Sequence, residues 1–177
     1  MSPARLLPSC IIITLLFIVG CSSGKDKPVD HLGEISFTVT GKAEAQPAFK
    51  KGLLLLHSFE YADAAEAFQQ AKETDPDFVM AWWGEAMTKN HPLWQEQDYD
   101  EGNRILNQLA PTPEARIAKA KTALEKDFIA GINILYGNGN KAERDSNYAV
   151  FMETLYKKYP GDNEVASFYS LALNGWG

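Results

Sequence analysis

The sequence has few cysteines, few histidines and few basic residues for its length. Its 177 residues include only two cysteines and three histidines, and 17 Lys plus Arg face 23 Asp plus Glu, a net charge of -6. Proteins that bind a nucleic-acid backbone present a basic surface, so nucleic acid is not an expected partner. Hydrophobic residues make up 45% and charged residues 23% of the chain. These proportions are those of a globular protein and exclude a disordered or collagen-like chain.

Common sequence signatures of enzymes are also missing. The chain contains no glycine-rich phosphate loop, no cysteine spacing typical of a metal site, no HExxH and no GxSxG. The sequence therefore favours a protein that is not an enzyme. No cofactor is expected, although a divalent metal is considered below.

The long hydrophobic run of the chain lies near the N-terminus. Arg5 precedes the apolar segment 11–19, which is shorter than the roughly 20 residues that span a bilayer. This combination is typical of a signal peptide over residues 1–20. The residues Ile18-Val19-Gly20-Cys21 that follow resemble the lipobox of bacterial lipoproteins. The resemblance implies that Cys21 is lipidated and joins the protein to a membrane.

The same resemblance implies a location in the cell envelope. In Gram-negative lipoproteins a serine after the lipidated cysteine goes with sorting to the outer membrane, and Ser22 has that place here. If the source is Gram-negative, we expect an outer-membrane protein that faces the periplasm. Residues 21–32 are polar and contain Gly, Ser and Pro, which predicts a flexible tether. The alternative is an ordinary secretory signal or an uncleaved anchor helix, in which Cys21 carries no lipid.

The periodicity of the apolar residues changes near residue 46. Ile35, Phe37 and Val39 alternate with polar residues, which predicts a short half-buried strand or extended lead-in within residues 33–45. The apolar residues of 46–177 recur at helical spacing, which predicts an all-α domain. The expected helices are 46–58, 61–74, one beginning near Phe78, a long one from Pro113 to about Leu135 with Thr112 as N-cap, and two more around 148–159 and 165–172.

Small and aromatic residues occur at defined places in the first helices. They are Gly52, Ala64, Phe68, Ala71, Pro76 and Trp82. This pattern resembles the tetratricopeptide repeat, a pair of antiparallel helices with a period of about 34 residues. The resemblance implies a helical-repeat solenoid with units 46–76, 77–110, 112–160 and an incomplete unit 162–177. A generic helical bundle is the alternative fold.

The last expected helix is apolar, whereas a solenoid ends in a helix with a polar outer face. We therefore expect either a longer protein, of which this chain is a fragment, or a partner that covers this helix.

The repeat resemblance implies a concave groove along the first helix of each unit. Trp82 is expected in the core, and Trp83, about 100° further round the helix, is expected in the groove. The groove candidates are Phe49, Leu53, Trp83, Met87, Asn90 and Trp94. Because this groove is more apolar than basic, it favours a protein or peptide partner. The predicted function is a lipid-anchored scaffold or assembly module.

Two other functions are considered. His57 and His91 lie 34 residues apart, each at the end of a first helix, so a regular stack would place them side by side. Imidazole is a common metal ligand, which predicts a metal site completed by oxygen ligands. The alternative is a structural role, because a histidine at the end of a helix often only caps backbone carbonyls or lies at the negative end of the helix dipole. The tryptophans suggest the third function, a glycan-binding outer-membrane lipoprotein whose aromatic rings stack on sugars.

Overall fold

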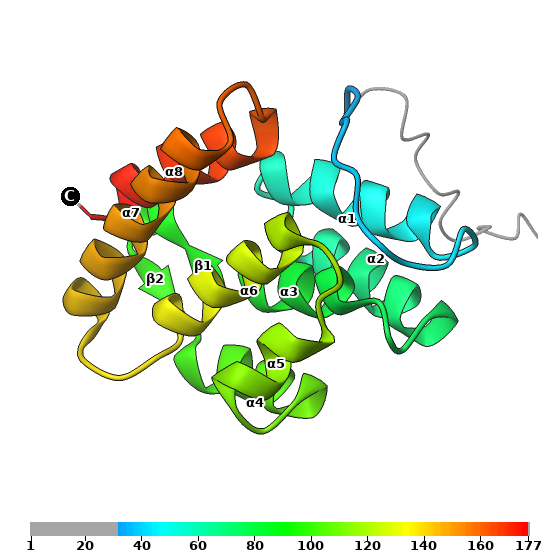
Figure 1. The fold of residues 1–177 in the computed structure, drawn as a ribbon, viewed down its shortest axis with the longest axis horizontal. Helices are drawn as coiled ribbons and strands as arrows, with labels where there is room; N and C mark the ends of the chain where they lie inside the picture. The colour runs from blue at the N-terminus through cyan, green and yellow to red at the C-terminus, as the bar shows by residue number, and fades with distance from the viewer. Residues whose placement is uncertain (1–31, 177) are drawn as a thin grey trace, which may run out of the picture.

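The computed structural model describes residues 32–176, and the signal peptide, Cys21 and residues 22–31 of the tether lie outside the described residues. It contains eight α-helices, a 3-10 helix and two short strands (Figure 1). These are α1 (Gln46–His57), α2 (Tyr61–Thr74), α3 (Val79–Met87), β1 (Asn90–His91), η2 (Pro92–Trp94), β2 (Glu96–Gln97), α4 (Tyr99–Leu109), α5 (Pro113–Lys119), α6 (Ala123–Leu135), α7 (Lys141–Lys158) and α8 (Asn163–Gly175). The all-α class is confirmed. Over 32–176, no helix combines the length and the apolar character needed to cross a membrane.

Helices α3 and α6 lie in the middle of the molecule, with α1 and α2 on one side and α7 and α8 on the other (Figure 1). Successive helices pack against one another, α1 with α2, α2 with α3, α3 with α4, α6 with α7 and α7 with α8. The Trp83 ring of α3 meets Phe128 of α6 edge-on at a centroid distance of 5.2 Å and Phe168 of α8 at 5.0 Å. One core therefore joins helices from distant parts of the chain.

The lead-in segment 33–45 forms no strand in the described structure, and its residues 43–45 are a turn that leads into α1. Phe37 and Val39 are buried and Ile35 is partly buried, so the alternation correctly identifies the inward side. The Phe37 ring lies 5.2 Å from that of Phe128 in α6. The expectation of a strand is wrong because helices, which offer no free edge for backbone pairing, lie beside this segment.

The strands that do form lie in the connection between α3 and α4. β1 and β2 are antiparallel, with Asn90 opposite Gln97 and His91 opposite Glu96, and η2 forms the turn between them. This hairpin occupies the segment between the two helices of the second predicted unit. It brings Trp94 to the surface.

The long helix expected from Pro113 is instead two helices, α5 and α6. Thr112 caps α5 as predicted, but a second cap interrupts the helix at Thr122. The Thr122 hydroxyl accepts from the Glu125 N–H at 3.2 Å, and the Glu125 carboxylate accepts from the Thr122 N–H at 2.9 Å. This reciprocal capping box starts a new helix. The third helix pair therefore begins at Ala123 and not at Pro113.

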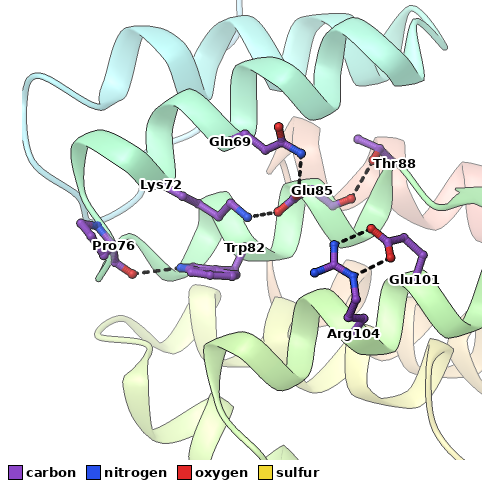
Figure 2. A network of polar contacts seen from close by, with 8 residues as sticks. All are labelled: Gln69, Lys72, Pro76, Trp82, Glu85, Thr88, Glu101 and Arg104. Carbon is purple, nitrogen blue, oxygen red and sulfur yellow. Dashed lines mark hydrogen bonds and ion pairs between the residues drawn. The ribbon is translucent and has the colours of Figure 1, made fainter.

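A polar network joins α2 to α3 (Figure 2). Gln69 donates to one oxygen of the buried Glu85 carboxylate at 2.9 Å, and Lys72 pairs with the other oxygen. Trp82 lies at the edge of this network, where its indole N–H donates to the Pro76 carbonyl at 2.9 Å and its ring centroid lies 4.0 Å from Lys72 Nζ. Trp82 is thus only partly buried and packs against the core from outside.

The burial of the adjacent residues Trp82 and Trp83 is the reverse of the prediction. Trp83, expected in an open groove, is 1% exposed, whereas Trp82, expected in the core, lies at its edge. The physical reason is that α6 and α8 cover the side of α3 on which Trp83 lies. Trp83 does lie on a different side of α3 from Trp82, as predicted, but the side of α3 that carries Trp83 is in the interior.

Candidate binding pocket

The ends of several helices converge on one pocket. The cavity itself is small, about 20 Å³, and it opens into a wider hollow whose free space, open solvent included, is about 510 Å³. Its walls come from α1, the α1–α2 turn, α2, α3, β1, η2, α6, α7 and α8, and they are mostly apolar. We call it the aromatic pocket, after a wall that includes Phe59, Tyr61, Met87, Tyr148, Phe168 and Leu171. Such a concave apolar site with few polar groups is typical of ligand-binding sites.

Phe59 reaches the pocket through an unusual helix end. The Phe59 N–H donates to the Leu56 carbonyl at 3.1 Å and the Glu60 N–H to the Leu55 carbonyl at 3.0 Å, which together form a Schellman cap. Phe59 has φ +61°, in the left-handed region where glycine is usual. A side chain there costs about 1–2 kcal/mol. A strained backbone therefore places this ring.

Four rings form a cluster beside the pocket. Tyr61 stacks on His91 with a centroid distance of 3.9 Å, and Trp94 lies edge-on to Tyr61 at 6.1 Å and to Phe59 at 6.0 Å. We call Phe59, Tyr61, His91 and Trp94 the aromatic cluster. Trp94 is 56% exposed. The cluster therefore offers open aromatic surface next to an apolar pocket.

Two residues with a strained backbone lie in or next to this cluster. Within residues 32–176, Phe59 and Gln95 are the non-glycine residues with positive φ, and Gln95 directly follows Trp94 with φ +54°. Strained residues tend to occur at functional sites, where the surrounding structure holds them. This observation, like the exposure of Trp94, points to the cluster as a site of function.

A small number of polar groups face the aromatic pocket. Lys141 and Asp145, one turn apart on α7, form an ion pair with an Nζ to Oδ2 distance of 2.5 Å. The Tyr61 hydroxyl is buried and has no hydrogen-bond partner among the described residues. Burial raises the pKa of Tyr61 and of Tyr148, so both phenols are neutral at pH 7. Tyr61 can therefore donate a hydrogen bond to an acceptor on a ligand.

A buried arginine holds the start of α7 against the pocket. Arg144 donates to the carbonyl of Leu135, the last residue of α6, at 3.1 Å and to the carbonyl of Gly139, in the turn between α6 and α7, at 2.5 Å. It also donates to Gln97 of β2 at 2.7 Å. Arg144 thus satisfies carbonyls that the end of α6 leaves free. The side of the pocket that carries Lys141 and Asp145 is consequently fixed to the hairpin.

The predicted groove residues divide into two groups. Phe49 and Leu53 are fully buried and Trp83 nearly so, so the prediction that they line an open groove is wrong. The expected groove is closed because the lead-in segment lies over α1, with the Phe37 ring 6.4 Å from that of Phe49, and because α6 and α8 cover Trp83. Met87 and Asn90 line the aromatic pocket, and Trp94 lies in the aromatic cluster beside it.

The two histidines have different neighbours. His57 Nε2 lies 2.7 Å from Glu164 Oε2, and its ring lies 5.3 Å from that of Phe168. His91 stacks on Tyr61, and its Nε2 lies 3.1 Å from the Thr88 carbonyl. The described residues contain no group of three or more His, Cys, Asp or Glu side chains placed to hold a metal ion. The metal site at His57 and His91 stays a prediction without an observed ligand set.

Sequence reasoning did not assign Phe59, Lys141 and Asp145 to a site. A phenylalanine in a left-handed helix cap gives no sequence signal, because glycine or asparagine usually marks this position. The spacing of Lys141 and Asp145 predicts a helix-surface pair, but nothing in the sequence connects that pair to residues 56–94. No protein-family model, no curated protein and no solved structure matches the chain.

Proposed function

We propose that this protein is a binding module that takes an apolar side chain of an extended partner peptide into the aromatic pocket. The observation that carries the proposal is the juxtaposition of a mostly apolar pocket with the half-exposed Trp94. Large aromatic side chains with a polar edge are the anchors of many protein interfaces. The module works as a scaffold or assembly protein, with no catalytic step.

The polar groups of the site favour a peptide over a glycan. A peptide brings a backbone carbonyl with every residue, which suits the single unpartnered hydroxyl of Tyr61. A sugar brings several hydroxyl groups, each of which loses its hydration in a pocket with mostly apolar walls. The glycan function is favoured only by the exposed Trp94 ring, so it is tested as the alternative.

We also propose that the first helix pairs are tetratricopeptide-like repeats. Gly52 of α1 supports this, because a Cβ atom there would lie 2.9 Å from the Phe68 ring of α2. A Cβ atom on Gly84 of α3 would overlap the same ring. Phe68 thus fills the space between two closely spaced first helices, which is the role that small and aromatic residues have in such repeats. The later helices depart from this pattern, since α6 begins a longer interval after α3.

The protein is further proposed to be lipid-anchored at Cys21 and to face the periplasm from the outer membrane. The support is the lipobox-like segment and the serine at position 22. A Cys21→Ser variant should remain unprocessed or become soluble. Continued labelling of that variant by a fatty-acid probe would contradict the lipid assignment.

Peptide binding is tested with the full chain in detergent. Random heptapeptides are displayed and selected on the protein, and the dissociation constant of each selected peptide is measured by fluorescence anisotropy. The variant Trp94→Ala should weaken binding at least tenfold, because it removes the exposed ring of the aromatic cluster. The matched control is Tyr156→Ala on α7, which removes another exposed aromatic side chain, 46% exposed and outside the pocket lining.

Each outcome decides between the functions. Peptides whose affinity falls in Trp94→Ala and not in Tyr156→Ala support the proposal. If no peptide is selected, or if the selected peptides bind both variants equally, the proposal is wrong. The glycan function would replace the peptide function if three results are found together. An oligosaccharide protects the tryptophan fluorescence, the Trp94→Ala variant loses this protection, and no peptide binds.

A further inference from the structure

We infer that the partner segment carries a lysine or arginine next to the apolar side chain that enters the aromatic pocket. This inference rests on the proposed function and concerns the same site. It specifies the chemistry of the partner from the charges around the aromatic cluster.

Two exposed acidic residues adjoin the cluster, Glu60 in the chain and Glu96 across the hairpin from His91. Glu60 lies between Phe59 and Tyr61 in the chain and is exposed. Glu96 of β2 has a side chain 74% exposed, with its Oε2 4.0 Å from His91 Nδ1. Within residues 32–176 the Glu60 carboxylate takes part in no ion pair. These two acids are therefore available to a positive charge on a partner.

The basic groups at the site are already engaged. Lys141, the lysine of the pocket lining, is neutralised by Asp145 at 2.5 Å. The His91 Nε2 faces the Thr88 carbonyl at 3.1 Å, so this nitrogen is the donor and carries a proton. Glu60 and Glu96 bring two negative charges to the border and His91 brings at most one positive charge, so the border of the pocket is net negative.

Aromatic surface and negative charge together favour a cation. A lysine or arginine placed over an aromatic ring gains cation–π attraction, and nearby carboxylates add Coulomb attraction that salt screens. The protein contains the same combination elsewhere, because Lys72 lies 4.0 Å from the Trp82 ring centroid while it pairs with Glu85. An acidic partner segment would be repelled by Glu60 and Glu96, and the net charge of -6 adds to this discrimination.

Three fluorescein-labelled peptides test this inference on the full chain in detergent. They are Gly-Ser-Lys-Leu-Arg-Ser-Gly, the acidic form with Glu in place of both basic residues, and the basic form with Gly in place of Leu. Anisotropy titrations should give an affinity for the basic leucine peptide at least tenfold above that of either other peptide. The advantage over the acidic peptide should shrink at high salt, because the deciding charges are exposed.

The charge dependence is assigned with a matched pair of variants. Glu60→Gln/Glu96→Gln should reduce the advantage of the basic over the acidic peptide to less than threefold, while leucine is still preferred to glycine. The control Glu73→Gln/Asp77→Asn removes two exposed acids at the far end of α2 and should leave the advantage unchanged. Both double variants change the net charge equally, so a difference between them reports position.

The outcomes separate this inference from the function on which it rests. If the acidic and basic leucine peptides bind equally, or if both double variants lose the advantage equally, the cation inference is overturned while the pocket function stands. If the glycine peptide binds as well as the leucine peptide, the pocket is not filled by an apolar side chain and both proposals fail. If none of the three peptides binds although heptapeptides are selected on the protein, the cation inference alone is overturned.

Discussion

At the scale of single residues, Phe59 is a side chain in a place that normally belongs to glycine. Its φ of +61° is enforced by the Schellman cap of α1, and its ring contributes to the aromatic cluster. The strained backbone at Phe59 therefore costs stability, while the ring that it places contributes to the site. Relief of the strain should raise stability, and loss of the ring should weaken binding.

A pair of substitutions separates the two effects. Phe59→Gly and Phe59→Ala remove the same ring, but only alanine keeps a Cβ atom in the left-handed region. Phe59→Gly should therefore be more stable than Phe59→Ala by about 1 kcal/mol in urea unfolding. Both variants should bind the basic leucine peptide at least fivefold more weakly than the unchanged protein. Equal stability of the two variants would show that the backbone there is not strained.

Gly84 makes a second residue-scale prediction with an unusual sign. Glycine to alanine inside a helix ordinarily stabilises by about 1 kcal/mol, yet a Cβ atom at position 84 would overlap the Phe68 ring. We expect Gly84→Ala to destabilise by about 2 kcal/mol in thermal and urea unfolding.

Gly131 of α6 is the matched control for this change. A Cβ atom there meets the Phe151 ring no closer than 3.3 Å, so Gly131→Ala should lose less than half as much stability. Equal losses at both positions would contradict the close approach of α1 and α3 around Phe68.

At the scale of the elements, Glu125 decides where one helix stops and the next begins. It is 1% exposed and its carboxylate accepts four hydrogen bonds, from the N–H groups of Lys121 and Thr122 and from both the N–H and the hydroxyl of Thr40. Burial alone would raise the pKa of Glu125, but these hydrogen bonds outweigh burial and hold the pKa below its usual value. The lead-in segment is thus fastened to the cap of α6.

The pKa of Glu125 gives a prediction about pH. Because the folded protein holds this carboxylate ionised, its contribution to stability is complete above the usual glutamate pKa and is lost as the pH falls through the lower folded value. Glu125→Gln should cost about 2 kcal/mol at pH 7, and the difference from the unchanged protein should shrink as the pH falls below about 4. A difference that stays constant down to pH 3 would contradict this role. The control is Glu73→Gln, which changes an exposed glutamate of α2.

The elements show which sequence patterns are informative. α1 and α2 were predicted within one residue because their apolar stripes end at a clear turn near Ser58. The break at 120–122 was missed even though Thr122 and Glu125 have capping-box spacing, because the apolar period continues through it. The β1–β2 hairpin was missed because its strands have two residues each, too short for a period of two to be seen.

At the scale of the whole molecule, the sequence predicts helix pairs but not how the last helix is placed. The apolar face of α1 and α3 has the same pattern whether it lines an open groove or a core. Phe49 is covered by nearby rings such as Phe37, but burial of Trp83 depends on contacts far along the chain. Phe168 of α8 supplies such a contact to both Trp83 and His57. The aromatic pocket exists only because this closure brings α7 and α8 to the ends of α1 and α3 (Figure 1).

A hydrogen bond between His57 and Glu164 joins the end of α1 to the start of α8, with a 2.7 Å distance between Nε2 and Oε2. In an open stack of helix pairs these elements have no reason to be coupled, because each unit contacts only its neighbours. In the closed arrangement a double-mutant cycle of His57→Ala and Glu164→Ala should give a coupling energy of about 1 kcal/mol at pH 7, since both side chains are mostly buried. The exposed pair of Glu153 and Lys157 within α7, taken through the same cycle, should give a smaller value. A coupling of zero between His57 and Glu164 would mean that α8 does not close on α1 in solution, and the aromatic pocket, whose wall includes α8, would then lose one of its sides.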